Sequence, residues 1–87
     1  MTKYYCSGAI VMSIAGRDKN EIYLIKKMDG SFAELINGKT RPLDSPKKKN
    51  IKHLHLLKRA VDIDWEKFNN ADAIVYLKDY KKSSDCK

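Results

Sequence analysis

Short stretches of apolar and β-branched residues, separated by turn residues, dominate the N-terminal part of the chain. Residues 8–15 are apolar or small on both faces, which is typical of a strand buried in a small barrel. Residues 21–28 and 31–36 predict two further strands, because each is followed by an Asp-Gly or Asn-Gly pair that favours a tight hairpin. The pattern therefore predicts a meander of three short antiparallel strands.

Residues 16–20 separate the first two predicted strands. Gly16 and Asn20 can adopt positive φ there, and Asp18 can hydrogen-bond to its own downstream backbone. We therefore expect a tight connection that reverses the chain at once.

Two prolines divide the segment that follows the meander. Residues 39–43 predict a fourth short strand, and Pro42 restricts it to an edge because proline cannot donate to a strand ladder. Residues 47–50, which follow Pro46, are all polar and predict a loop.

Residues 52–57 alternate between polar and apolar positions, as a half-buried strand does. Leu54 and Leu56 are expected to face the core. His53 and His55 are then expected to share the solvent-facing side of this fifth strand.

The period changes near the C-terminus, where helices are predicted. Asp64 is expected to start a short helical turn that reaches Phe68, and Asn70 to cap a helix that runs to about Lys81. An apolar stripe on this helix is expected to pack on aromatic side chains of the preceding turn. The residues of the stripe are Ile74, Leu77 and Tyr80 or Lys81, and the aromatic residues are Trp65 and Phe68.

The chain has 87 residues, enough for one core but not for two. Its hydrophobic content of 43% is ordinary for a folded protein. These observations predict a mainly β fold, a five-stranded small barrel followed by one or two short helices. No apolar run approaches the roughly 20 residues that cross a bilayer, so a cytoplasmic protein without a membrane partner is expected.

Two cysteines, Cys6 and Cys86, lie near opposite ends of the sequence. A disulfide between them is geometrically possible, but a disulfide framework in a small secreted domain usually needs more cysteines. We therefore expect reduced thiols in a reducing cytosol.

Residues 39–59 contain eight of the eighteen basic residues and a single acid, Asp44. Elsewhere acidic and basic residues balance, so the formal net charge of +7 arises in this segment. Such an imbalance favours contact with phosphates, because each cation adds attraction and releases counterions. The ammonium groups of Lys47, Lys48 and Lys49 are expected to form one cluster that holds phosphates whatever the base.

Two sequence blocks resemble a known family. GAIVMSIAGRDKN at residues 8–20 and NGKTRPLDSPKKKNIKHL at residues 37–54 resemble the small bacterial KOW-domain proteins related to eukaryotic-type large-subunit ribosomal proteins. Asn20 stands where that family usually has glycine, and asparagine is the next most tolerant residue of positive φ.

The resemblance implies a five-stranded SH3-like (KOW-type) barrel, which we assign to residues 1–62. The pattern of the remaining residues predicts a helical extension of the same domain over 63–82 and a flexible tail over 83–87. It also implies RNA binding, with ribosomal RNA and the ribosome or a ribosomal subunit as partners, by a protein that is monomeric when free. The candidate RNA-binding residues are Arg17, Lys19, Lys39, Arg41, Lys47, Lys48, Lys49, Lys52, His53 and His55.

Guanidinium groups differ from ammonium groups, because those of Arg17 and Arg41 can also stack on a base or read a guanine edge. No Phe, Tyr or Trp occurs in residues 39–59, which predicts structured RNA such as rRNA or tRNA, held by its backbone without stacked single-stranded bases.

The aromatic residues outside this segment are assigned mainly to packing: Tyr4, Tyr5 and Tyr23 to the core or its rim, and Phe32, Trp65 and Phe68 to the core.

Three other functional classes compare differently with the sequence. The sequence contains no nucleophile turn, HExxH motif or P-loop, so no enzymatic activity and no cofactor are expected. Zinc binding by His53 and His55 with Cys6 or an aspartate is disfavoured, because the usual ligand spacing is missing. The alternative to RNA binding is a protein-interaction module that docks on an acidic partner. Its contact surface would be the helix face with Asp72, Lys78, Asp79 and Lys81.

Overall fold

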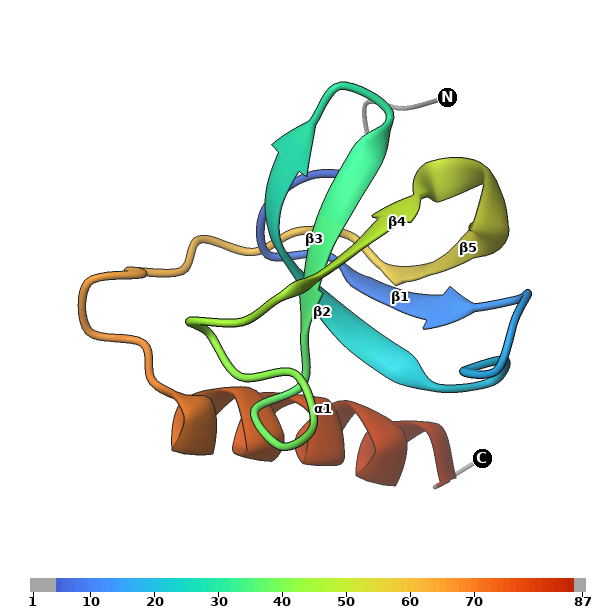
Figure 1. The fold of residues 1–87 in the computed structure, drawn as a ribbon. Helices are drawn as coiled ribbons and strands as arrows, with labels where there is room; N and C mark the ends of the chain where they lie inside the picture. Colours follow the sequence, from blue (N-terminus) through green and yellow to red (C-terminus); the bar gives the residue numbers. More distant parts are fainter. Residues whose placement is uncertain (1–4, 86–87) are drawn as a thin grey trace.

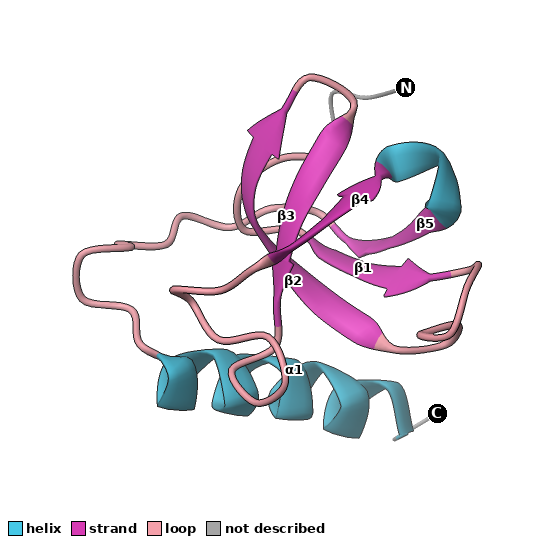
Figure 2. Cartoon of the chain, in the orientation of Figure 1, coloured by secondary structure: helices cyan, strands magenta, loops and turns pink. Residues whose placement is uncertain are grey.

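A computed structural model describes residues 5–85 as one five-stranded sheet with a C-terminal helix (Figure 1, Figure 2). The order of the hydrogen-bonded strands is β4-β3-β2-β1-β5, and every neighbouring pair is antiparallel. The predicted mainly β fold with a C-terminal helix is therefore confirmed. The elements are β1 (Ile10–Ser13), β2 (Ile22–Asp29), β3 (Phe32–Ile36), β4 (Lys47–Asn50), the 3-10 turn η2 (Ile51–His53), β5 (Leu54–Lys58) and α1 (Asn70–Asp85).

One face of the sheet encloses an apolar cluster to which β1, β2, β3 and β5 all contribute. Because side chains from both halves of the sheet meet there, the sheet curls around the cluster. Within residues 5–85, however, β4 and β5 form no ladder with each other, so the sheet is not closed by hydrogen bonds. The buried residues of this cluster are Ala9, Val11, Tyr23, Ile25, Ala33, Leu35 and Leu54.

Helix α1 covers the opposite face of the sheet and crosses one end of it in Figure 1. Ala73 and Leu77 of the helix are buried in one cluster with Ile10, Leu24 and Ile36. These three residues belong to successive strands of the sheet, so the helix packs on a continuous apolar face.

The helix begins one residue earlier than its predicted cap implied. Asn69 is the capping residue, because its Oδ1 accepts a hydrogen bond from the Asp72 amide at 2.9 Å. The Asn69 amide in turn donates to Asp72 Oδ2 at 3.1 Å, which is a reciprocal pair of the capping-box type. Asn70 is the first helical residue, and its side-chain oxygen accepts from the Leu43 amide at 2.8 Å. Asn70 therefore ties the helix to the loop before β4.

The predicted strand at residues 39–43 is wrong, because these residues form a turn and bends. The Asn37 side-chain oxygen accepts from the amides of Lys39 and Arg41, both at 2.9 Å, and so takes up two donors that a ladder would need. Lys26 Nζ donates to the Leu43 carbonyl at 2.9 Å and holds the loop against β2.

The predicted loop at residues 47–50 is instead strand β4, which pairs along its length with β3. Its register runs from Leu35 opposite Lys47 to Phe32 opposite Asn50. An edge strand has only one hydrogen-bonded neighbour and can carry charge on both faces, so it lacks the alternation that marks other strands. For this reason the polar sequence of residues 47–50 did not indicate a strand.

Strand β5 confirms most of the predicted strand at residues 52–57. Leu54 is buried and Leu56 is partly buried against the same cluster, as predicted. His53 and His55 are both exposed, but His53 belongs to η2, so the two histidines do not share one strand face.

The assignment of aromatic residues to the core is partly wrong. Phe32 is 44% exposed at the end of the hairpin between β2 and β3. Trp65 and Phe68 are partly buried against the cluster under α1, and their rings meet edge to face at 5.1 Å. The turn at Asp64 occurs as predicted, with its carboxylate accepting from the Glu66 amide at 3.2 Å.

Helix α1 continues to Asp85, beyond the predicted end at Lys81. In the described part of the chain, no helix has both the length and the apolar character that crossing a membrane requires. Cys6 is exposed, and Cys86 lies outside the described residues, so the predicted state of the two thiols stays a prediction.

Substitution of Gly38 tests how tightly the loop packs on the helix. Gly38 has φ +79°, and a Cβ there would lie 2.3 Å from the Asn70 carbonyl oxygen. Gly30 is the matched control, because it also has positive φ (+62°) but no atom lies within 4 Å of its Cβ position. Gly30→Ala should lower the free energy of unfolding by about 1 kcal/mol, and Gly38→Ala by about 1–3 kcal/mol more.

Urea titrations of the two glycine variants measure both changes. Equal losses for Gly30→Ala and Gly38→Ala would contradict the close packing of the loop on α1.

Candidate nucleic-acid interface

Asp18 lies at the centre of a hydrogen-bond cluster between the turn at residues 16–20, the sheet and β4. Its Oδ1 accepts from Ser13 Oγ at 2.7 Å and from Lys49 Nζ at 2.8 Å. Its Oδ2 accepts from Lys47 Nζ at 2.8 Å and from the Tyr23 hydroxyl at 3.2 Å. Four donors from three strands therefore converge on one carboxylate, which we call the Asp18 cluster.

The turn aims this carboxylate back over the sheet. Gly16 and Asn20 both have positive φ, at +84° and +77°, as predicted for these positions. The Asn20 amide donates to the Ser13 carbonyl at 2.7 Å, which closes the turn. In place of the hydrogen bond predicted from the Asp18 side chain to its own downstream backbone, the carboxylate accepts from the side chains of Ser13, Tyr23, Lys47 and Lys49.

The Asp18 cluster is largely shielded from water. The side chain of Asp18 is 10% exposed, that of Lys49 13% and that of Lys47 28%. Burial alone would raise the pKa of Asp18, but hydrogen bonds from Lys47, Lys49 and Ser13 outweigh it and hold the pKa well below its usual value. Burial and the neighbouring carboxylate also raise the pKa of Tyr23 to about 12. Asp18 is therefore ionised and Tyr23 protonated at neutral pH.

The three consecutive lysines do not form the single cluster that the sequence suggested. Successive strand residues point to opposite faces, so Lys47 and Lys49 face Asp18 while Lys48 faces the other way. Lys48 Nζ instead pairs with Asp29 Oδ2 at 2.9 Å, and both side chains are exposed. Lys49 also donates to the Ala15 carbonyl at 2.9 Å, so its ammonium group is bound within the protein and stabilises the fold.

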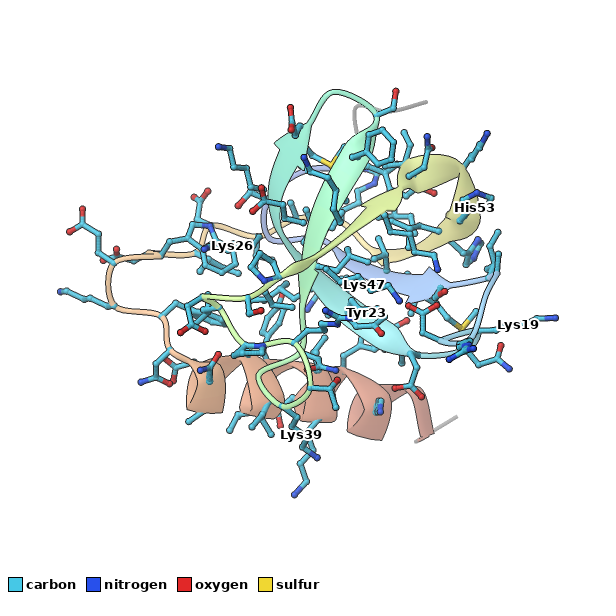
Figure 3. The ribbon with its side chains drawn as sticks, viewed as in Figure 1. Lys19, Tyr23, Lys26, Lys39, Lys47 and His53 are labelled. Carbon is cyan, nitrogen blue, oxygen red and sulfur yellow. The ribbon has the colours of Figure 1, made fainter. Side chains whose placement is uncertain are left out.

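A group of basic side chains does gather around the Asp18 cluster. Arg17 and Lys19 flank Asp18 on the turn and are exposed. The Ile14 amide donates to the His53 carbonyl at 2.9 Å, which brings η2, with exposed Lys52 and His53, beside that turn. Figure 3 shows Lys19 and His53 on the same side of the molecule, with Lys47 between them and the centre of the sheet. We call this surface the basic end, and its residues are Arg17, Lys19, Lys47, Lys52 and His53.

Other predicted site residues lie elsewhere. Lys39 is exposed on the loop that passes α1, away from Lys19 and His53 in Figure 3. Arg41 is half-buried, close enough to Tyr23 for its charge to oppose the rise in that pKa. His55 is exposed on β5 opposite Met12 in the ladder. The basic segment at residues 39–59 is therefore spread around the sheet and is not one patch.

Sequence reasoning missed the central role of Asp18 and its contact with Tyr23. One signal was available: Ser13 lies on a strand face with Ala9 and Val11, and a polar side chain on a buried face needs a hydrogen-bond partner. Its partners are Asp18 and the Ala15 carbonyl.

The basic end suits anions and not metal ions. Among residues 5–85, no group of three or more His, Cys, Asp or Glu side chains is arranged to hold a metal ion. Exposed cations dominate the basic end, so the ligands it suits are anions.

Comparisons with known proteins give no assignment: no protein-family model matches this sequence, and no curated protein matches it. The resemblance of residues 8–20 and 37–54 to KOW-domain proteins therefore stays a prediction.

Replacing Asp18 tests the cluster directly. Asp18→Asn leaves two partly buried ammonium groups without their anion, so the free energy of unfolding at neutral pH should fall by about 3 kcal/mol. Asp29→Asn is the matched control, because it removes the same charge from an exposed pair and should change stability little. Urea titration measures both variants, and similar losses would contradict the central role of Asp18.

The pH dependence of stability gives a second test of the Asp18 charge. The pKa of Asp18 is lower in the folded protein than in the unfolded chain, so its full contribution is present above the unfolded value of about 4. That contribution is lost as the pH falls toward the lowered folded-state pKa. The stability difference between the native protein and Asp18→Asn should therefore be constant from about pH 7 to about pH 5 and shrink below about pH 4. A difference that persists unchanged at about pH 2 would exclude the Asp18 charge as its source.

Proposed function

We propose that this protein binds structured RNA by gripping its phosphate backbone with the basic end. The observation that carries the proposal is the convergence of the 16–20 turn, β4 and η2, which gathers Arg17, Lys19, Lys52 and His53 on one exposed surface. Basic side chains that share one exposed surface suit successive phosphates of a folded RNA strand.

The Asp18 cluster supports this proposal by fixing the backbone that carries the exposed cations. Lys47 and Lys49 hold the carboxylate between Arg17 and Lys19, so the turn is already ordered before a ligand arrives. A preformed surface loses less conformational entropy on binding than a flexible loop does. Lys49 therefore acts on RNA binding by positioning the turn, and the exposed cations make the contacts.

The Asp18 cluster presents no open aromatic ring to a base, which favours structured RNA over single strands. Tyr23, the aromatic residue of the Asp18 cluster, is 4% exposed and its hydroxyl is engaged by Asp18. It offers no open ring face to a base, whereas proteins that read single strands present such rings. Arg17 is the residue of the basic end that can add a base contact to the phosphate contacts.

The fold supports an assignment to SH3-like barrels of the KOW type. β1 lies between β2 and β5, a 3-10 turn links β4 to β5, and the curled sheet shares one core. Together with the blocks at residues 8–20 and 37–54, this arrangement favours ribosomal RNA, on the ribosome or a ribosomal subunit, as the partner of a protein that is monomeric when free.

Salt dependence of RNA binding tests the proposal. The affinity for an RNA hairpin, measured by fluorescence anisotropy, should fall linearly with salt on a log-log plot. Lys52→Ala should weaken binding to different hairpins by similar factors and reduce the slope by about one. Lys67→Ala is the matched control, because it removes the same exposed charge from the linker before α1 and should leave the slope unchanged.

A flat log-log plot would exclude phosphate contacts as the source of binding. Equal effects of Lys52→Ala and Lys67→Ala would show that only the net charge of the protein matters.

A further inference from the structure

A groove lies on another side of the molecule, between α1, the start of β2 and the turn that follows β3. Its volume is about 370 Å³, within the range of about 300–1,000 Å³ that is usual for ligand sites. Figure 3 shows Lys39 on this turn, beside α1. The residues that line the groove are Glu21, Ile22, Asn37, Lys39, Ile74, Leu77, Lys78 and Lys81.

The lining combines aliphatic side chains with ammonium groups. Ile22, Ile74 and Leu77 supply the apolar part. Leu77 also belongs to the cluster beneath α1, and Ile22 packs against it. Among the residues that the structure describes, Lys39, Lys78 and Lys81 supply three positive charges against the one carboxylate of Glu21. None of these described lining residues is aromatic, so none offers a ring on which a base could stack.

The three groove lysines are available to a ligand. The ion pairs formed among the described residues use Lys47, Lys48 and Lys49, and none of them includes a lysine of the groove. Lys39, Lys78 and Lys81 are all exposed, and they come from two separate elements.

The walls of the groove are preformed. Gly38 packs directly on the helix at Asn70, and Asn37 holds the amides of Lys39 and Arg41. The turn therefore keeps its distance from α1 without a ligand, which lowers the entropy lost when one binds.

We propose that this groove docks an acidic segment of a partner protein that carries an aliphatic side chain. The aliphatic side chain would lie on Ile22, Ile74 and Leu77, and flanking carboxylates would meet the three lysines. RNA fits the groove less well, because a phosphate backbone gains nothing from an aliphatic floor. This site is separate from the basic end, so the proposal does not rest on RNA binding.

Methyl NMR of the full-length protein tests the proposal. The probe is a short synthetic peptide with one leucine flanked on both sides by glutamates, and the readout is the shift of the Ile22, Ile74 and Leu77 methyl signals. The shifts of these signals should grow with peptide concentration and reach a plateau. A control peptide with serine in place of leucine should bind at least about tenfold more weakly, because the aliphatic contact is lost.

Charge-reversal variants locate the site. Lys78→Glu combined with Lys81→Glu should lower the affinity for the leucine peptide by at least about tenfold, because the new glutamates then face the glutamates of the peptide. The control is Lys67→Glu. Lys67 lies outside the proposed groove, in a second hollow that Asp62, Asp64 and Asp72 also line, so its reversal should change the affinity much less. Arg17→Ala should leave peptide binding unchanged, which separates this site from the basic end.

Four results would overturn the proposal: no methyl shifts with the leucine peptide, equal binding of the serine peptide, equal weakening by Lys67→Glu, or saturable shifts of the same methyls by an RNA hairpin. The last result would assign the groove to RNA. A failure of the peptide experiment would leave the salt dependence of RNA binding at the basic end unaffected, so the two proposals fail separately.

Discussion

The carboxylate of Asp18 connects parts of the sheet that the strand ladders leave apart. β4 pairs with β3 alone, whereas Asp18 lies in the turn between β1 and β2, yet Lys47 and Lys49 of β4 both reach it. The edge strand is thereby held beside that turn. A buried anion is stable only when its charge and hydrogen bonds are satisfied, and here two ammonium groups and two hydroxyl groups satisfy it. This arrangement fixes the turn that displays Arg17 and Lys19 against β4.

The parts of the fold that the sequence predicted are those in which a segment's own residues decide its structure. β1, β2 and β3 are apolar stretches between turn residues, and positive φ occurs at Gly16 and Asn20 as expected. β4 could not be found this way, because an edge strand is defined by its partner and its own residues are all polar. The turn at residues 39–43 escaped prediction for a related reason, since the side chain of Asn37 competes with the ladder for backbone donors.

The charges of the candidate site were visible in the sequence, but their partners were not. Consecutive lysines suggested one cluster, whereas the alternation of a strand sends Lys48 to Asp29 and its two neighbours to Asp18. A carboxylate in a glycine-bounded turn gives no sign of contacts about thirty positions away, which only the folded chain creates. Lys39 and Lys78 likewise line one groove beside α1 only because folding brings their two segments together.

The lysines of β4 have a further consequence for how this protein behaves at high concentration. β4 ends the sheet, so one side of its backbone has no strand partner among the described residues and could pair with a strand of another molecule. Such pairing leads to aggregation, and short edge strands with lysine and a nearby proline oppose it. β4 has four residues, three of them lysines, and follows Pro46 directly. The same sequence that supports the Asp18 cluster therefore also keeps the open edge of the sheet from recruiting a second copy.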